Sequence, residues 1–243
     1  MPFKDREQAA RLLAGRLSHY RGLNPLVLGV PRGAVPMARI IADALEGDLD
    51  VVLVHKLRAP RQPELAIGAI DETGRSHLAD YARELGVDDY IEAEKQTQLA
   101  ELQRRRRAYT GVQAPIDPTG RIVIVVDVGI ATGASMLAAL RCVRARAPRR
   151  LVVATAVAPP ETLRRLEAEA DEVVCLETPE YFGAVGAFFE DFSQVSDEEA
   201  VAALARRPQQ ACAAPAASPG TRPRGIAVRD WFGYLEPCAP GHT

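Results

Sequence analysis

The stretch RIVIVVDVGIATGASMLAAL, residues 121–140, decides the expected fold, because a wholly apolar run ends there on one carboxylate, Asp127. Small and hydroxylated residues follow at once, and a helical pattern begins near residue 134. A strand, a tight turn and a helix in this order are typical of phosphate sites in α/β proteins, since backbone N–H groups at a helix start point outward and the helix dipole attracts an anion. We therefore expect an anion site beside Asp127.

Two common nucleotide-binding turns do not match this stretch. The turn lacks the lysine of G-x-x-x-x-G-K-[ST], which argues against a P-loop, and it does not fit the G-x-G-x-x-G pattern of dinucleotide folds. A simple strand-to-helix turn with Ser or Thr as N-cap is the alternative. That alternative does not require a charge at the end of the strand.

Short apolar runs alternate with helical patterns along the rest of the chain, which is typical of a parallel α/β sheet. Runs such as IVIVV and LVVATAV do not alternate with polar residues, as in strands that helices cover on both faces. The predicted strands are Leu26–Val30, Asp50–Lys56, Ile122–Asp127, Leu151–Val157 and Glu172–Leu176. The predicted helices are 34–46, 88–109, 134–147 and 160–170. Residues 57–87 break this rhythm with one short strand-like piece, Leu65–Ile70, and we interpret them as an irregular functional loop.

Composition favours one ordinary globular domain with a tail. The chain has 243 residues and a formal net charge of -2, which gives no reason to expect nucleic acid as a partner. No apolar run approaches the roughly 20 residues of a membrane helix, and the charged N-terminus has no signal-peptide core. We therefore expect a cytoplasmic protein without a membrane partner. From residue 208 the composition turns Ala/Pro-rich, which predicts a linker and tail over 208–243.

The segment VIVVDVGIATGAS resembles the phosphoribosyl-diphosphate (PRPP) signature of type I phosphoribosyltransferases, in which an apolar strand, an acidic pair and a Thr-Gly turn follow one another. The resemblance implies that Asp127 contacts the ribose hydroxyls. It also implies that a loop holds the sugar 5′-phosphate, and the corresponding residues are Gly129, Ile130, Ala131, Thr132, Gly133, Ala134 and Ser135. The second acid of the pair is missing, because Val128 stands in its place.

A second matching segment, LGVPRGAVPMA, follows the first predicted strand. In the family this is the pyrophosphate loop, and Pro31, Arg32 and Gly33 fit it; the planar fork of an arginine suits an anion with several oxygens. Lys56 ends the second predicted strand. If the strands are parallel, Arg32, Lys56 and Asp127 all lie at carboxyl ends, where open α/β sheets bind ligands. We therefore predict these three as the catalytic residues.

The order of these parts resembles a bacterial, cytoplasmic branch of the family whose acceptor is not established. That branch carries P-E-L-A-I-G-A after the second strand and the segment matched here by Phe182–Glu199, so the resemblance covers residues 1–207. It implies a type I phosphoribosyltransferase-like fold, mainly a parallel central sheet flanked by helices. It also implies a flexible loop over 57–80 and a hood built from the N-terminal helix and about 177–207. Tyr181 and Phe182 are candidates to stack on a flat acceptor.

The resemblance implies Mg²⁺-dependent transfer of 5-phosphoribose from PRPP to a nitrogenous, nucleobase-like acceptor, with release of pyrophosphate. The magnesium ion is expected to arrive on PRPP, near Asp127, without a protein ligand cluster, and the dimers common in the family make a homodimer an expectation. Val128 leaves a second hypothesis open, a sensor that binds PRPP or a nucleotide without turnover. A hydrolase acting on PRPP is a third and weaker alternative.

Overall fold

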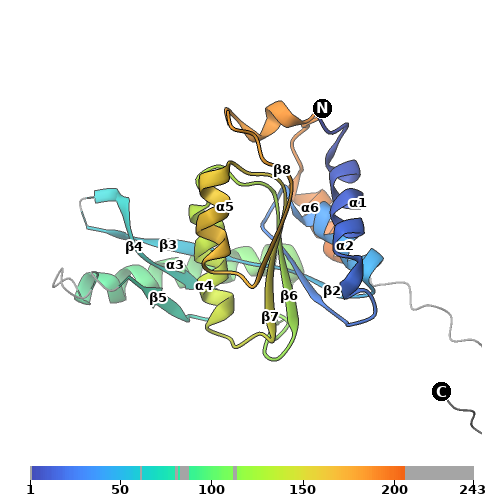
Figure 1. The fold of residues 1–243 in the computed structure, drawn as a ribbon. Helices are drawn as coiled ribbons and strands as arrows, with labels where there is room; N and C mark the ends of the chain where they lie inside the picture. The colour runs from blue at the N-terminus through green and yellow to red at the C-terminus, as the bar shows by residue number, and fades with distance from the viewer. Residues whose placement is uncertain (1, 61, 80–81, 83–87, 112–113, 206–243) are drawn as a thin grey trace, which may run out of the picture. The chain divides into compact units, whose positions relative to one another are not determined.

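The computed structural model describes residues 2–60, 62–79, 82, 88–111 and 114–205 (Figure 1). Within them, a five-stranded parallel sheet has the order β2-β1-β6-β7-β8, and a separate antiparallel sheet has the order β3-β4-β5. The predicted fold class, a mainly parallel sheet flanked by helices, is confirmed. The predicted linker and tail, 208–243, lie outside the described residues.

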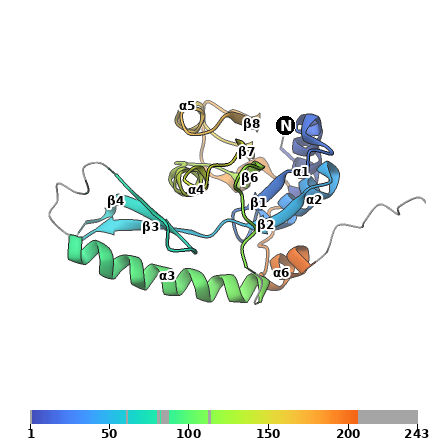
Figure 2. The same cartoon turned by 90° about the horizontal axis from the view of Figure 1, so that it is seen from below.

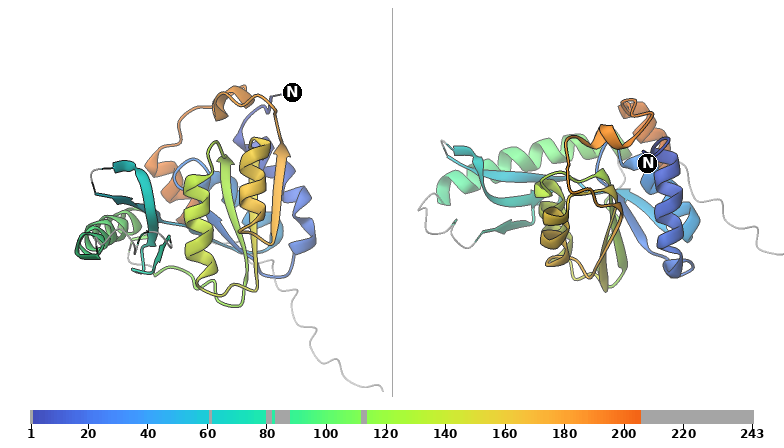
Figure 3. Two further views of the ribbon diagram at one scale, coloured as in Figure 1. Left: turned by 60° about the vertical axis from the view of Figure 1, so that its left-hand side comes forward. Right: turned by 45° about the horizontal axis from the view of Figure 1, so that its top comes forward.

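The parallel sheet is covered on both faces. Helices α1 (Arg6–Arg16) and α2 (Val35–Leu45) pack on one face, and α4 (Ala134–Arg144) and α5 (Pro160–Glu167) pack on the other (Figures 1 and 3). The five strands are β1 Leu26–Gly29, β2 Asp48–Val51, β6 Ile122–Gly129, β7 Arg150–Val157 and β8 Glu172–Glu177. Two short 3₁₀ turns, η1 (Ser18–Tyr20) and η3 (Val185–Phe188), and the helix α6 (Asp197–Ala205) complete this part of the chain.

Strand β6 shows why the apolar runs lack polar alternation. Its Ile124 and Val126 lie in the core on the α1 and α2 face, whereas Val123 and Val125 lie in the core on the α4 and α5 face. All four side chains are fully buried. A strand with cores on both sides has no solvent face, so its sequence reads as a continuous apolar run.

The order of the strands changes direction between β1 and β6. After β1 the chain continues to β2 on one side, whereas β6 pairs with β1 on the other side. Ligands of open α/β sheets bind at such a switch point, outside the carboxyl ends of the strands. The turn that follows β1 and the turn that follows β6 both lie at this edge.

The single strand predicted over Asp50–Lys56 is wrong. The chain leaves the parallel sheet at Val51 and starts strand β3 (Val54–Ala59), which pairs antiparallel with β4 (Gln62–Asp71) in the second sheet. Val52 and Leu53 lie between the two strands and are buried apolar residues. The apolar pattern of the sequence therefore continues from β2 into β3 and does not reveal where one strand ends and the next begins. With β5 (Ser76–Leu78), these strands also replace most of the irregular loop predicted over 57–87.

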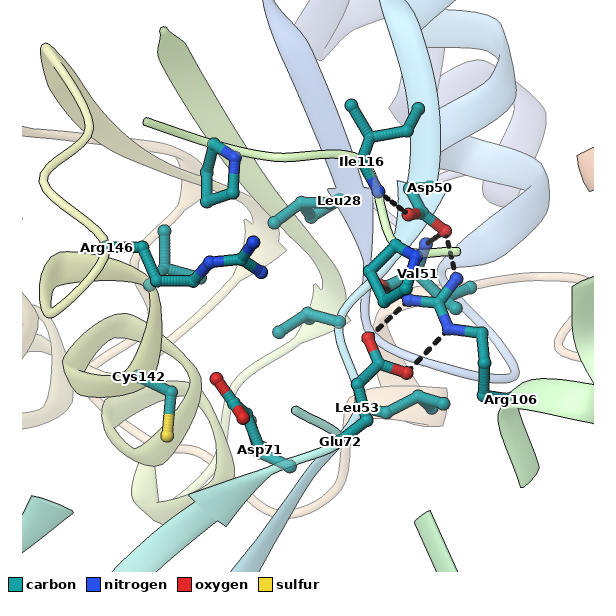
Figure 4. A pocket seen from close by; sticks show the side chains of 15 residues that line it. Leu28, Asp50, Val51, Leu53, Asp71, Glu72, Arg106, Ile116, Cys142 and Arg146 are labelled. Carbon is teal, nitrogen blue, oxygen red and sulfur yellow. Dashed lines mark hydrogen bonds and ion pairs between the residues drawn. The ribbon is translucent and has the colours of Figure 1, made fainter. Parts of the chain in front are cut away.

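The second sheet and helix α3 (Asp88–Thr110) form an arm beside the parallel sheet (Figure 2). A buried ionic cluster ties this arm to β2 (Figure 4): the Arg106 guanidinium bonds the carboxylates of Asp50 and Glu72, and the Ile116 N–H donates to Asp50 Oδ2 at 2.9 Å. All three charged side chains are at most 8 % exposed. Buried charges are stable only when paired in this way, so the cluster fixes where the arm leaves the sheet.

The segment between β8 and α6 crosses the carboxyl edge of the parallel sheet (Figure 3). It is held by the N-terminal segment, because the Phe3 N–H donates to the Phe188 carbonyl at 2.8 Å and the Glu190 N–H donates to the Phe3 carbonyl at 2.8 Å. The rings of Phe3 and Phe189 pack at a centroid distance of 5.4 Å. Two distant parts of the chain therefore build one cover over this edge.

Candidate active site

Asp127 lies near the carboxyl end of β6, in register with Thr155 of β7. Its Oδ1 accepts a hydrogen bond from the Val128 N–H at 2.8 Å. Burial raises the pKa of Asp127 to about 7, and the Val128 hydrogen bond opposes that shift. No arginine, lysine or histidine among the described residues forms an ion pair with this carboxylate, so it is available to a ligand.

Val128, at the position of the missing acid, is a packing residue. It is 6 % exposed and belongs to the core on the α1 and α2 face, whereas Asp127 points to the opposite face of the sheet. A methyl group placed on Gly33 would lie 3.3 Å from Val128 Cγ2. The turn after β1 therefore packs directly on the residue next to Asp127.

The turn after β6 presents an uncapped helix start. Gly133 occupies the N-cap of α4 with φ 74°, and no side-chain cap hydrogen bond is formed. The alternative of a turn capped by Ser or Thr is therefore wrong for the described structure. The left-handed conformation requires glycine, and a methyl group here would lie 2.9 Å from Thr162 Cγ2. The first-turn N–H groups of α4 are left free to bind an anion.

Helix α5 fixes this turn through two side-chain hydrogen bonds. Thr162 Oγ1 donates to the Ala131 carbonyl at 2.6 Å, and Arg165 Nη1 donates to the Thr132 carbonyl at 3.1 Å. Strand β7 also holds the turn, because the Ile130 N–H donates to the carbonyl of Val157, the last residue of β7, at 2.9 Å. Sequence reasoning missed Thr162 and Arg165, because no local pattern links α5 to a turn about 30 residues earlier. Because the carbonyls of Ala131 and Thr132 point toward α5, the N–H groups of the turn can point away from α5.

The turn after β1 places Arg32 at the same edge. The Val30 N–H donates to the Val126 carbonyl at 2.9 Å, and the Pro31–Arg32 peptide bond is cis. The Arg32 side chain is 41 % exposed and its Nη1 lies 3.6 Å from Asp197 Oδ1 on α6. It lines a groove of about 370 Å³ between this turn, α3 and α6.

Lys56 does not lie where the sequence predicts it. It belongs to β3, paired with Ala69 in the antiparallel sheet, and not to the carboxyl end of a parallel strand. Its side chain lines a cavity of about 210 Å³ together with Ala134 and Ala138 of α4. The structure therefore brings Lys56 to the flank of α4, while Arg32 and Asp127 remain at the edge of the parallel sheet.

The two aromatic candidates differ in their surroundings. Tyr181 is 91 % exposed, whereas the Phe182 ring stacks on Phe188 at a centroid distance of 5.6 Å. The same segment approaches the site through Val185, whose Cγ1 would lie 2.5 Å from a methyl group placed on Gly129. Glycine at 129 therefore lets the covering segment sit close to the end of β6.

The described residues contain neither a cluster of metal ligands nor a membrane-spanning helix. No three His, Cys, Asp or Glu side chains there gather as a metal site. None of the helices described has the length and apolarity to span a bilayer.

Comparison with known proteins shows the family to which the chain belongs. The family model described as phosphoribosyl transferase domain matches residues 4–191. Two curated Mycobacterium tuberculosis proteins, each named "Putative phosphoribosyl transferase", are 45% identical over 206 residues, which is 84% of this chain and 46% of theirs. The chain thus spans about half the length of these relatives. The crystal structure of TT1426 from Thermus thermophilus is 47% identical, covers 84% of this chain and 98% of its own, and superposes with a TM-score of 0.78. The chain belongs to the phosphoribosyl transferase domain family.

Proposed function

We propose that this protein transfers 5-phosphoribose from PRPP to a nitrogenous, nucleobase-like acceptor and releases pyrophosphate. One observation carries the proposal: an uncapped helix start and a carboxylate without an ionic partner lie side by side at the switch point of a parallel sheet. The first binds a phosphate group, and the second accepts hydrogen bonds from vicinal hydroxyls. PRPP carries both groups on one ribose.

In the proposed reaction the C1′–oxygen bond of PRPP breaks and a C1′–nitrogen bond forms. The bonding electrons leave with pyrophosphate, and the acceptor nitrogen releases its proton. The turn of residues 131–135 would fix the 5′-phosphate, and Asp127 would fix the ribose hydroxyls. Anchoring at two points holds C1′ in place for attack, which lowers the entropic part of the barrier.

The leaving group needs positive charge. Arg32, in the turn that packs on Val128, would donate to pyrophosphate, and a magnesium ion arriving on PRPP would neutralise charge there as part of the substrate. Lys56 lines a separate cavity along α4, so we assign the pyrophosphate contact to Arg32. Tyr181 is exposed and available to stack on the acceptor, whereas Phe182 already packs on Phe188.

The test is release of pyrophosphate from PRPP by the full chain with Mg²⁺ and a panel of purine and pyrimidine bases. We expect release that depends on one class of base and falls about 10–100-fold in Asp127→Asn, since a charge-assisted hydrogen bond contributes roughly 1.5–3 kcal/mol. Glu180→Gln, which removes an exposed charge from the covering segment, serves as the control and should keep full activity.

The other two hypotheses predict different results. A sensor would bind PRPP and release no pyrophosphate with any base; the absence of the second acid at Val128 favours this hypothesis. A hydrolase would release pyrophosphate with no base added. Either result would replace the transferase proposal.

A further inference from the structure

A cavity lies along the flank of α4 and begins at Ala134, next to the turn that follows β6. This α4 cavity has a volume of about 210 Å³ and lies between the antiparallel sheet and α4, which pack on each other through Ala69 and Ala138. Its wall is made of small or apolar residues, with basic side chains among them. The lining residues are Lys56, Gly68, Ala69, His77, Ala79, Ala134, Leu137, Ala138, Arg141 and Arg165.

Three cations from three different elements face this space. Lys56 comes from β3, Arg141 from α4 and Arg165 from α5. The Lys56 side chain is half-buried and forms no ion pair or hydrogen bond with the side chains or backbone of the described residues, although its backbone pairs with Ala69 in the sheet. Arg141 is paired with Glu169 at 2.8 Å, outside the lining. No lining residue carries a carboxylate, so the cavity holds excess positive charge.

We propose that the α4 cavity, which borders the turn of residues 131–135 at Ala134, binds a second group, a dianionic phosphate. Lysine and arginine together recognise phosphate by charge-assisted hydrogen bonds. The cavity continues past His77 and Arg141 into a groove of about 610 Å³ along α4, which has room for an organic part attached to the phosphate. The ligand class is therefore a phosphate monoester of nucleotide size or free phosphate.

Arg165 connects this cavity to the proposed active site. Its Nη1 donates to the Thr132 carbonyl at 3.1 Å, within the turn assigned to the 5′-phosphate. A phosphate group in the α4 cavity would compete with that carbonyl for the guanidinium. Occupancy would then change PRPP affinity, and linkage requires PRPP to change affinity for the second ligand by the same factor. This coupling rests on the proposed function, but binding in the cavity does not.

The experiment is calorimetric titration of the full chain with inorganic phosphate, ribose 5-phosphate and AMP, in the presence of saturating PRPP and Mg²⁺. We expect at least one of the three to bind with a stoichiometry of one. Lys56→Gln and Arg165→Gln should each weaken that binding about 10-fold, the loss of one charge-assisted hydrogen bond. Inorganic phosphate binding as tightly as AMP identifies free phosphate as the ligand, whereas tighter binding of AMP identifies a monoester.

Arg164→Gln is the matched control, because it removes the same charge from an exposed position on α5 that does not line the cavity. Failure of all three compounds to bind, or equal binding by wild type and Lys56→Gln, would overturn the proposal. If PRPP itself does not bind, the titrations are repeated without it in Gly133→Ala, which disturbs the turn of residues 131–135. Binding that survives Gly133→Ala and is lost in Lys56→Gln supports the cavity even where the transferase proposal has failed.

Discussion

Arg32 in the turn after β1 and Asp197 at the start of α6 face each other, with 3.6 Å between Nη1 and Oδ1. Asp197 Oδ1 also lies 3.5 Å from the Tyr109 hydroxyl on α3. The carboxylate of Asp197 thus lies close to Arg32, the residue that we assign to pyrophosphate. Both partners are largely exposed, and such pairs contribute about 0–1 kcal/mol to stability.

Asp197→Asn should bind PRPP more tightly, because pyrophosphate no longer competes with a carboxylate for Arg32. We expect a decrease in Kd of about 2–5-fold by calorimetry, on the scale of a screened surface pair. Glu198→Gln removes the same charge from the next residue of α6 and should leave the Kd unchanged. Weaker binding by Asp197→Asn would show that Asp197 instead positions Arg32 for the ligand.

Asp127 should make both PRPP binding and stability depend on pH. Its pKa of about 7 lies above the roughly 3.9 of an unfolded aspartate, so between these values the folded state keeps a proton that the unfolded state has lost. The free energy of unfolding contributed by Asp127 therefore falls as pH rises from about 4 to 7, and the loss is complete above 7. Affinity for PRPP should rise over the upper part of this range, because the ionised carboxylate is the better acceptor.

Calorimetry and urea unfolding between about pH 5 and 8 test both slopes against Asp127→Asn. The variant experiences the same ionisation of PRPP but lacks the carboxyl group, so its affinity profile should be flatter and its stability should fall less with pH. Identical profiles for wild type and variant would show that Asp127 does not titrate in this range.

Gly133→Ala tests the turn itself, with Gly22→Ala as a matched control. Both glycines have φ 74°, so alanine costs about 1–2 kcal/mol at either position. A methyl group on Gly22 meets nothing within 4 Å, whereas one on Gly133 lies 2.9 Å from Thr162 Cγ2. We expect both variants to lose stability in urea, and Gly133→Ala alone to lose PRPP affinity, by at least about 10-fold. Equal affinity in both variants would remove the turn from the PRPP site.

Val128→Asp restores the family's acidic pair in sequence, and it tests whether the second acid is needed for function. Val128 is 6 % exposed in the core on the α1 and α2 face, so an aspartate there buries a charge without a partner. We expect a loss of at least about 2 kcal/mol in urea unfolding near pH 8 and no gain in turnover, with Val128→Thr losing less. A stable Val128→Asp protein with raised turnover would show that the second acid is functionally missing.

The sequence predicts the edge of the parallel sheet well, because each part there depends on local pattern. The apolar run before Asp127, the glycine turn and the helix after it are contiguous, and the same holds for the turn at Arg32. The sequence predicts the wrong position for Lys56, because Val52 and Leu53 continue the apolar pattern where the chain passes from the parallel sheet to the antiparallel sheet.

Long-range contacts were beyond sequence reasoning. Thr162, Arg165 and Asp197 reach the two turns from helices far along the chain, and no spacing rule identifies such partners. The packing role of Val128 could not be predicted either, since its neighbour Gly33 is 95 positions away in sequence. What depends on tertiary packing had to come from the structure.

A crystal structure of the full chain with PRPP and Mg²⁺ would decide between these sites at once. We predict density for the 5′-phosphate on the N–H groups of residues 131–135, for the ribose hydroxyls within hydrogen-bond distance of Asp127, and for pyrophosphate against Arg32. Density for the 5′-phosphate anywhere else, including the α4 cavity beside Lys56, would contradict the assignment of the active site.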